Sequence, residues 1–304
     1  MSESPPKNKP QRRHITEDEK IQWAQTFQRL MAVSLGAVFF EKQIDFAMHG
    51  GLALSLYYGL PRTTQDMDFL IDRQKVHALT SSVVVAVGVV REVYKEAGLN
   101  VDLDLTTKTG NENSIWRYKI TSSSENIMGS VKVNMEFWPV HVQYILDRVV
   151  SGELAKGTEN GYSLPSNCVF TGGNILSDKL LALLMRPYVK WSDVFDLSFL
   201  ASTIKEMELG SILGGMDGHA KAYTVPQYEV LKRRVDAILS HSDEEMRASI
   251  RGAFGESGGK LLSGSVAPDA IIDSAPERLR VLLPMALAQF EPSATPAPTG
   301  SSAP

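Results

Sequence analysis

One short segment restricts the fold more than any other, because it combines an apolar run, a glycine pair and two closely spaced aspartates. The apolar run over residues 46–48 reads as a strand and stops just before Gly50-Gly51. Residues 52–58 look helical, and Asp66-Met67-Asp68 then opens a second predicted strand. Each motif alone is common in solvated turns. Their order, strand, Gly-Gly, helix and Asp-x-Asp strand, is much more specific and predicts a functional site.

The chemistry of this segment follows from its backbone. Gly50 and Gly51 let the chain turn sharply and leave amide N–H groups at a helix N-terminus, with no side chain in the way of a phosphate. Asp66 and Asp68 are two apart on a strand, so their carboxylates share one face and repel unless a cation lies between them. Mg²⁺, held by carboxylates and triphosphate oxygens, suits this position. The pattern predicts nucleotide chemistry on an NTP with two Mg²⁺ ions.

A third carboxylate usually completes such a site, and the sequence offers two candidates. Glu136 lies on the polar face of a strongly alternating predicted strand, which it shares with Trp138. Asp104 lies on the polar face of an earlier one. We favour Glu136 as the third metal ligand, because its strand is more apolar and therefore more central. For either residue, a solvent-facing acid on a half-exposed sheet is the alternative.

Hydrophobic periodicity divides the chain into two halves. Period-two alternation predicts half-buried strands in the first half, over residues 101–105, 116–120 and 131–138. Helical signals dominate after residue 150, and capping boxes mark two helix starts, at Thr16 with Glu19 and at Ser242 with Glu245. Helices are expected over residues 76–98, 175–185, 193–203, 226–239, 242–254 and 277–290. The fold class is therefore α+β, a mixed sheet flanked by helices and followed by a helical C-terminal domain.

Composition limits the remaining possibilities. The 304 residues are 43% hydrophobic and 22% charged, with a net charge of −4, so the whole-protein field does not indicate nucleic-acid binding. The single cysteine, Cys168, reads as a small buried residue. With no apolar run of about 18 residues and no apolar stretch behind the N-terminus, a cytoplasmic protein without membrane contact is expected. The predicted divisions are a disordered arm over 1–15, an α/β domain over 16–150, a helical domain over 151–290 that completes the active site, and a disordered tail over 291–304.

A second polar cluster is predicted in the helical half. Lys179 and Arg186 are seven residues apart, so they share a helix face and could stabilise the charge of a pyrophosphate leaving group. Asp193 and Asp196 share a face in the same way. The alternative is that the two cations lie at a helix edge while Asp193 caps the next helix. Asp196 is expected to pair internally with Arg186 or Arg62.

Two further basic features have open interpretations. Arg62 could hold a phosphate or pin the turn before the aspartates through a carboxylate, and the second is favoured. Thr63 and Thr64 are expected to shape that turn by local hydrogen bonds. Residues 232–234, Lys-Arg-Arg, could meet an RNA backbone, although a solvated helix face is the preferred interpretation.

Two parts of the sequence resemble a known family. His49-Gly50-Gly51-Leu52-Ala53-Leu54 and residues 58–69, YGLPRTTQDMDF, are similar to the AbiEii/AbiGii-type (MenT-like) nucleotidyltransferase toxins of the DNA polymerase β-like superfamily, with Met67 for the usual Ile. Residues 178–182, DKLLA, and 190–197, KWSDVFDL, match a second family segment, although residues 187–192 replace a more basic lead-in. The resemblance covers roughly residues 44–200.

The resemblance implies a fold, an activity and a biological role. It implies a nucleotidyltransferase-type sheet, a triphosphate contact for Lys179, and a place for Asp193 in the active site. Arg62, Thr64 and Arg186 are further nucleotide-binding candidates. The acceptor would be tRNA or another nucleic acid, and the role a toxin in a toxin–antitoxin or phage-defence pair, with an antitoxin or its transcriptional regulator as partner. An antibiotic-modifying enzyme and a catalytically silent NTP-binding module remain alternatives.

Overall fold

The computed structural model describes most of the chain between the two termini. Described are residues 13–64, 66–96, 99–104, 116–124, 127–149, 168–204, 206–214, 216, 225–254, 260–262 and 266–292. Most of the expected arm (1–15) and tail (291–304), and the start of the expected helical domain at 151–167, lie outside these residues. The chain forms two compact units, Met1–Thr171 with Glu256–Ser265, and Gly172–Gly255 with Val266–Pro304.

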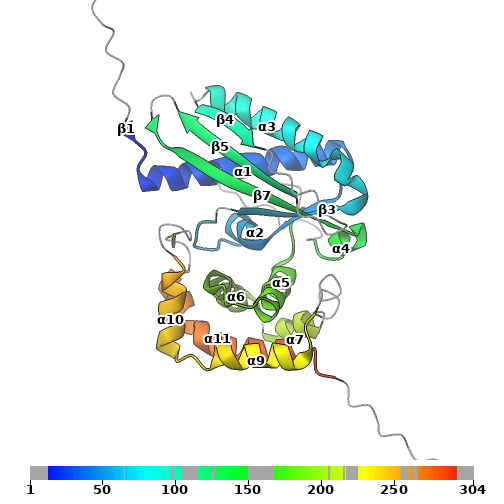
Figure 1. The fold of residues 1–304 in the computed structure, drawn as a ribbon, viewed down its shortest axis with the longest axis vertical. Helices are drawn as coiled ribbons and strands as arrows, with labels where there is room; N and C mark the ends of the chain where they lie inside the picture. Colours follow the sequence, from blue (N-terminus) through cyan, green and yellow to red (C-terminus); the bar gives the residue numbers. More distant parts are fainter. Residues whose placement is uncertain are drawn as a thin grey trace, which may run out of the picture. The chain divides into compact units, whose positions relative to one another are not determined.

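A five-stranded mixed sheet organises the first unit (Figure 1). Its strand order is β2-β3-β7-β5-β4; β3 and β7 are parallel, and the other neighbouring pairs are antiparallel. The strands are β2 (Phe46–His49), β3 (Asp66–Asp72), β4 (Leu99–Asp104), β5 (Trp116–Ser124) and β7 (Ser130–Val140). A second, two-stranded sheet joins β1 (Arg13–His14) to β6 (Ile127–Met128). The alternation of polar and apolar residues therefore located the main strands correctly.

Helices α1 (Glu17–Glu41) and α3 (Leu79–Glu96) pack against each other and cover one face of this sheet. The predicted capping box of α1 is confirmed, since Thr16 and Glu19 exchange their side-chain and backbone hydrogen bonds. On the buried side of α1, its residue Phe39 contacts the ring of Phe137. Phe137 in turn stacks on Phe69 at a centroid distance of 5.0 Å. This aromatic core fixes which faces of β3 and β7 are buried.

Helix α3 forms most of the helix expected over residues 76–98 and includes a run of valines. It follows the 3₁₀ helix η1 (Arg73–Ala78) and buries Val83, Val87 and Val90, while Val84, Val85 and Val89 are about half exposed. By length and composition alone, residues Arg73–Glu96 could cross a membrane. In this structure α3 instead packs on α1 and β4 as a helix of the α/β unit.

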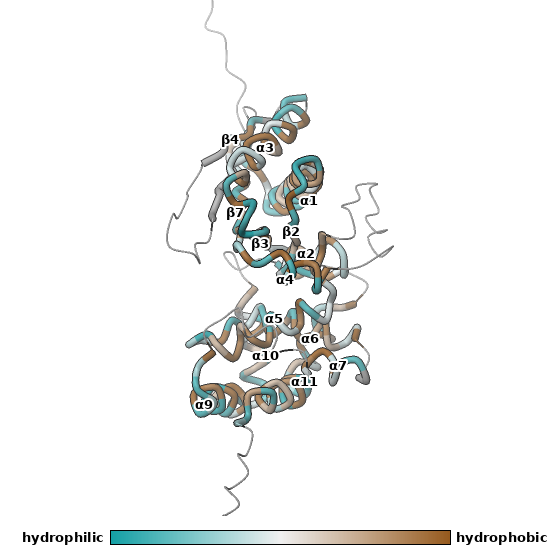
Figure 2. The backbone as a smooth tube through the Cα atoms, turned by 90° about the vertical axis from the view of Figure 1, so that its right-hand side faces the viewer, coloured by the Kyte–Doolittle hydropathy of each residue, from teal (hydrophilic) through white to brown (hydrophobic). Residues whose placement is uncertain are grey.

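The second unit is helical, as expected. Helix α6 packs against α5, α10 and α11, and its residues 193–200 are all buried. Helix α9 carries both hydrophilic and hydrophobic residues (Figure 2), and it buries Leu231, Val235 and Ile238. The helices are α5 (Gly172–Met185), α6 (Trp191–Thr203), α7 (Glu206–Gly214), α9 (Tyr228–Leu239), α10 (Asp243–Gly252) and α11 (Pro268–Ala288), whereas the short α4 (Val142–Leu146) belongs to the first unit.

The start expected for the last helix was wrong. We expected it to begin at Glu277, but α11 begins at Pro268 and continues through Pro276 and Pro284. A proline inside a helix removes one backbone hydrogen bond, which usually ends the helix. Here Pro276 is itself buried, beside an apolar face that includes Ile272 and Leu279. Burial of this face offsets the local cost.

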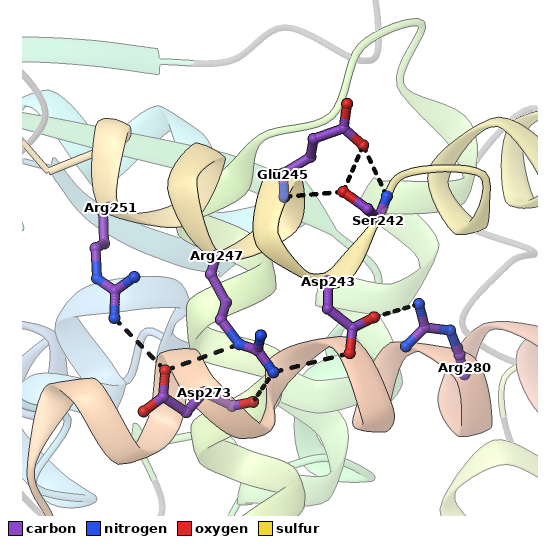
Figure 3. Close-up of polar contacts among 7 residues, drawn as sticks. All are labelled: Ser242, Asp243, Glu245, Arg247, Arg251, Asp273 and Arg280. Atoms are coloured by element: carbon purple, nitrogen blue, oxygen red, sulfur yellow. Dashed lines mark hydrogen bonds and ion pairs between the residues drawn. The ribbon is translucent and has the colours of Figure 1, made fainter.

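Charged side chains join α10 to α11 at the surface (Figure 3). Asp273 lies 3.5 Å from Arg251 and 3.8 Å from Arg247, and Arg280 binds Asp243 at 2.5 Å. The capping box predicted for Ser242 and Glu245 is present at the start of α10. These pairs are exposed, so each contributes little to stability.

Candidate active site

The junction between β2 and α2 (Gly50–Tyr57) brings the glycine pair against an aspartate. His49, the last residue of β2, is the antiparallel register partner of Asp68. Gly50 follows with a φ of +70°, a conformation that L side chains rarely adopt. A Cβ atom at Gly50 would collide with the carboxylate of Asp68. The glycine is thus required both by the backbone and by the side chain beside it.

The parallel pairing of β3 and β7 aligns the predicted carboxylates. Asp68 is the register partner of Glu136, and Asp66 is the partner of Asn134, whose Nδ2 donates to Asp66 Oδ1 at 3.1 Å. These residues alternate with the fully buried Met67 and Met135, so they lie on the face opposite the aromatic core. The backbone of Asp104 is on β4, three strands from β3, about 14 Å away at the usual strand spacing. Register therefore favours Glu136 over Asp104.

The carboxylates have the chemistry that a magnesium ion needs. Asp66, Asp68 and Glu136 are half-buried side chains that offer hard oxygen ligands. Among the described residues, no three His, Cys, Asp or Glu side chains converge closely enough to hold a metal by themselves. Mg²⁺ is usually bound by one or two carboxylates together with substrate phosphates rather than by an all-protein cage. The residues present fit such an ion.

The turn before β3 lies against the glycine pair. Arg62 is 6% exposed, and its Nη1 donates to the carbonyl of Thr63 at 2.9 Å. A Cβ atom at Gly51 would lie 2.8 Å from Arg62 Nη2 and 3.3 Å from Thr64 Oγ1. The start of α2 thus has a guanidinium and a hydroxyl beside it, both capable of donating to an anion.

The second predicted cluster lies in the helical unit. Lys179 of α5 binds two buried aspartates of α6, Asp193 at 2.5 Å and Asp196 at 2.9 Å. Arg186 binds the other oxygen of Asp193. Burial alone would raise the pKa of Asp193, but the cations of Lys179, Lys190 and Arg186 hold it well below its usual range. All four predicted residues therefore form one ion-pair network.

Two details of this cluster depend on tertiary packing. Asp196 pairs with Lys179, where we had expected Arg186 or Arg62. Asp193 is not the cap of α6, because Lys190 occupies that position and Asp193 lies in the first turn. Arg234, the last residue of the basic run, donates to the carbonyls of Leu184 and Met185 at 2.8 and 2.5 Å. It therefore satisfies the C-terminus of α5 instead of facing solvent.

Comparison with known families identifies the chain. The model of the nucleotidyl transferase AbiEii toxin family, a type IV toxin–antitoxin system, matches residues 29–263. The chain belongs to the AbiEii family. Both halves of the predicted site fall within the matched residues, and the resemblance read from the sequence is confirmed. This AbiEii chain is therefore a nucleotidyltransferase of a toxin family, and that family implies a cognate antitoxin as partner.

Other comparisons give more distant likenesses. No curated protein sequence matches the chain. JHP933 from Helicobacter pylori is similar over 91% of this chain and 95% of its own, with 17% identity and a TM-score of 0.48. A candidate nucleotidyltransferase from H. pylori is 16% identical, with a TM-score of 0.45, and the match covers 91% of this chain and 98% of that one. The antibiotic-resistance factor ANT(2'')-Ia is 12% identical, with a TM-score of 0.36, and the match covers 65% of this chain and 95% of that one. Because these TM-scores are below 0.5, the assignment rests on the family match.

Sequence reasoning missed three contributors around the first cluster. Asn134 binds Asp66, and its position two residues before Glu136 on the same strand face could have indicated this. Gln28 is 2% exposed and donates to the carbonyl of Thr64 at 2.9 Å. Residues 260–262 pair with the Arg62 turn from almost 200 residues away along the chain. No local signal indicates the last two contacts.

Proposed function

We propose that this AbiEii toxin uses Mg²⁺ to transfer a nucleoside monophosphate from an NTP to a hydroxyl group of RNA, with tRNA as the acceptor. The observation that carries the proposal is the register of Asp68 with Glu136 on parallel strands, directly beside Gly50. It gathers hard oxygen ligands next to backbone amides at a helix start, a combination suited to a metal-bound triphosphate.

In the proposed reaction, the acceptor oxygen attacks the α-phosphorus of the NTP and pyrophosphate leaves. Asp66, Asp68 and Glu136 would hold the metal, and Glu136 would also orient the acceptor hydroxyl. The proton of that hydroxyl passes to solvent water as the new O–P bond forms and the bond from the α-phosphorus to pyrophosphate breaks. A metal held there would supply the positive charge that neutralises the triphosphate and lowers the pKa of the attacking hydroxyl. Gly50 and Gly51 would leave room for the phosphates beside Arg62 and Thr64.

The second cluster has a proposed role in the same reaction. The resemblance to the family supports a triphosphate contact for Lys179, with Arg186 also binding nucleotide and Asp193 acting with Lys179. The ion pairs of Lys179 with Asp193 and Asp196 fix the direction of its ammonium group. A cation fixed before the substrate binds loses little freedom when it contacts a phosphate.

The test is transfer of label from each of the four α-³²P-labelled NTPs to total tRNA, DNA, protein or an aminoglycoside. We expect labelled tRNA with wild-type protein and MgCl₂, no label with EDTA, and recovery when excess MgCl₂ is added. The Asp68→Asn variant should lose at least about 100-fold in rate, because it removes a metal ligand. Asp102→Asn, an exposed aspartate on β4, is the matched control and should keep the wild-type rate.

Other outcomes separate the alternatives. NTP binding without transfer to any acceptor would indicate a catalytically silent module. Label in the aminoglycoside with unlabelled tRNA would contradict the RNA acceptor and leave the transferase chemistry standing. Equal rates with EDTA and with MgCl₂ would contradict the metal requirement.

A further inference from the structure

A short segment from the far end of the chain pairs with the turn that precedes the predicted metal ligands. The Thr63 N–H donates to the carbonyl of Lys260 at 2.8 Å, and the Lys260 N–H donates to Thr63 Oγ1 at 2.7 Å. The Leu262 N–H donates to the carbonyl of Pro61 at 2.9 Å. Arg62 and Leu261 form an antiparallel bridge. Residues 260–262 thus bind the turn through backbone and side chain together.

This segment belongs to the first unit, although the chain on either side of it belongs to the second. Helices α10 and α11 are in the helical unit, and Glu256–Ser265 is counted with the sheet. The chain therefore leaves the helical unit and re-enters it here. Residues 260–262 are half-buried, and their backbone makes hydrogen bonds to the turn.

The turn is also held by α1, which precedes it in the sequence. Gln28 of α1 donates to the carbonyl of Thr64 at 2.9 Å, and its side chain is almost fully buried. Thr64 Oγ1 in turn lies 3.4 Å from the carbonyl of Asp66, at the start of β3. Two segments that are remote in sequence thus hold three consecutive residues, 62–64. The last of them, Thr64, is two positions before Asp66, the first predicted metal ligand.

The residues held in this way are those that lie against the glycine pair. Arg62 Nη2 and Thr64 Oγ1 are the nearest atoms to the position of a Cβ on Gly51. The start of a helix carries partial positive charge, and the guanidinium of Arg62 adds to it. An anion such as a phosphate would stabilise this arrangement. Small shifts of the turn would move both donors relative to the amides of α2.

We infer that residues 260–262 are a positioning element of the nucleotide site, which holds Arg62 and Thr64 in place to bind the triphosphate of an NTP. The inference rests on the proposed function, because it assigns the segment to the same NTP site. The hydroxyl of Thr63 joins the segment to the turn, and Thr63 is therefore a positioning residue that acts through Arg62 and Thr64.

The experiment compares Thr63→Val with Thr63→Ser. Valine keeps the shape of threonine but cannot accept from the Lys260 N–H, whereas serine keeps the hydroxyl. Thr203→Val is the matched control, because it removes a threonine hydrogen bond at the end of α6 in the other unit. The dissociation constant of each MgNTP is measured by calorimetry, and amide hydrogen exchange is measured at residues 51 and 260–262.

For Thr63→Val we expect the affinity for the preferred MgNTP to fall about tenfold, with faster exchange at residues 260–262. Thr63→Ser and Thr203→Val should bind as the wild type does. If Thr63→Val binds the nucleotide as tightly as the wild type, the positioning role is wrong and the proposed function stands. If the wild-type protein binds no MgNTP, the proposed function fails, and the inference fails with it. A loss of affinity that Thr63→Ser does not rescue would also contradict the inference.

Discussion

At the scale of single residues, burial decides what each charged side chain does. Asp193 and Asp196 are almost completely buried in ion pairs, whereas Asp66, Asp68 and Glu136 are only partly buried, on the face of the sheet opposite the aromatic core. A buried carboxylate stays charged only when cations surround it, and Lys179 and Arg186 supply them. The partly buried carboxylates can accept a ligand from solvent instead.

The third carboxylate can be tested by two substitutions. Glu136→Gln should reduce transfer at least about 100-fold, because Glu136 lies in register with Asp68, the predicted metal ligand. Asp104→Asn should keep transfer within about twofold, because its backbone is three strands from β3. Initial rates at saturating NTP and MgCl₂ measure both. The reverse result would make Asp104 the third ligand.

The network around Asp193 predicts a pH-dependent stability. The folded-state pKa of Asp193 is below the unfolded value of about 3.9, so its contribution is complete above that pH and is lost as the pH falls further. At pH 7, Asp193→Asn should lower the free energy of unfolding by about 3 kcal/mol. Below pH 4, the difference from wild type should shrink by about 1.4 kcal/mol per pH unit.

Urea unfolding at pH 7, 5, 4 and 3 measures this difference. Asp243→Asn is the control, because Asp243 is exposed on α10 and its ion pairs are screened by solvent. A difference between wild type and Asp193→Asn that is as large at pH 3 as at pH 7 would show that the pKa of Asp193 is not depressed.

At the scale of secondary structure elements, two glycines at the ends of α2 allow backbone strain to be compared with a role in the predicted site. Gly50 and Gly59 both have φ near +70°, at the two ends of α2, but only a Cβ on Gly50 meets another side chain, that of Asp68. Ala at Gly59 should cost about 1–2 kcal/mol of stability, and Ala at Gly50 should cost more, because its Cβ also collides with Asp68. Transfer activity should fall for Gly50→Ala alone, as urea unfolding and label transfer together can measure. Equal activity of the two variants would contradict a role for the junction of β2 and α2.

The ion pairs between α10 and α11 should behave differently from the buried network (Figure 3). Asp273 is 61% exposed and lies 3.5–3.8 Å from two arginines. Asp273→Ala should therefore change the free energy of unfolding by about 0.5 kcal/mol or less, and the change should vanish in 1 M NaCl. Thermal unfolding at low and high salt checks this. A large, salt-independent loss would mean that the helices depend on these charges.

At the scale of the whole molecule, the biological role as a toxin can be tested by growth. Induction of the chain alone in a bacterium should arrest growth, and Asp68→Asn should relieve the arrest at an equal protein level. Asp68 is the better choice than Lys179, because Lys179→Ala would leave two buried carboxylates short of a cation and could abolish folding. Colony counts and immunoblots give the readout. Arrest by Asp68→Asn at wild-type level would contradict toxicity through nucleotidyl transfer.

The sequence by itself determined most of the local structure and located the residues of the candidate site. Alternation located the strands that carry Asp68 and Glu136, and capping boxes located the starts of α1 and α10. Spacing put Lys179 and Arg186 in one cluster, where both bind Asp193. These features depend on neighbours within a few residues, so local patterns report them. The start of α11 was misjudged for the same reason: a local rule about proline could not include the burial of Pro276 by other helices.

Only the tertiary structure decided which remote groups meet. The register of β3 with β7 places Glu136 beside Asp68. The fold also brings Gln28 and residues 260–262 to the turn at Arg62. It also pairs Asp196 with Lys179, and it lets Arg234 donate to a carbonyl at the end of α5. Such pairings are set by the packing of elements far apart in sequence, where loop closure and burial of the whole unit, rather than local preference, determine the free energy.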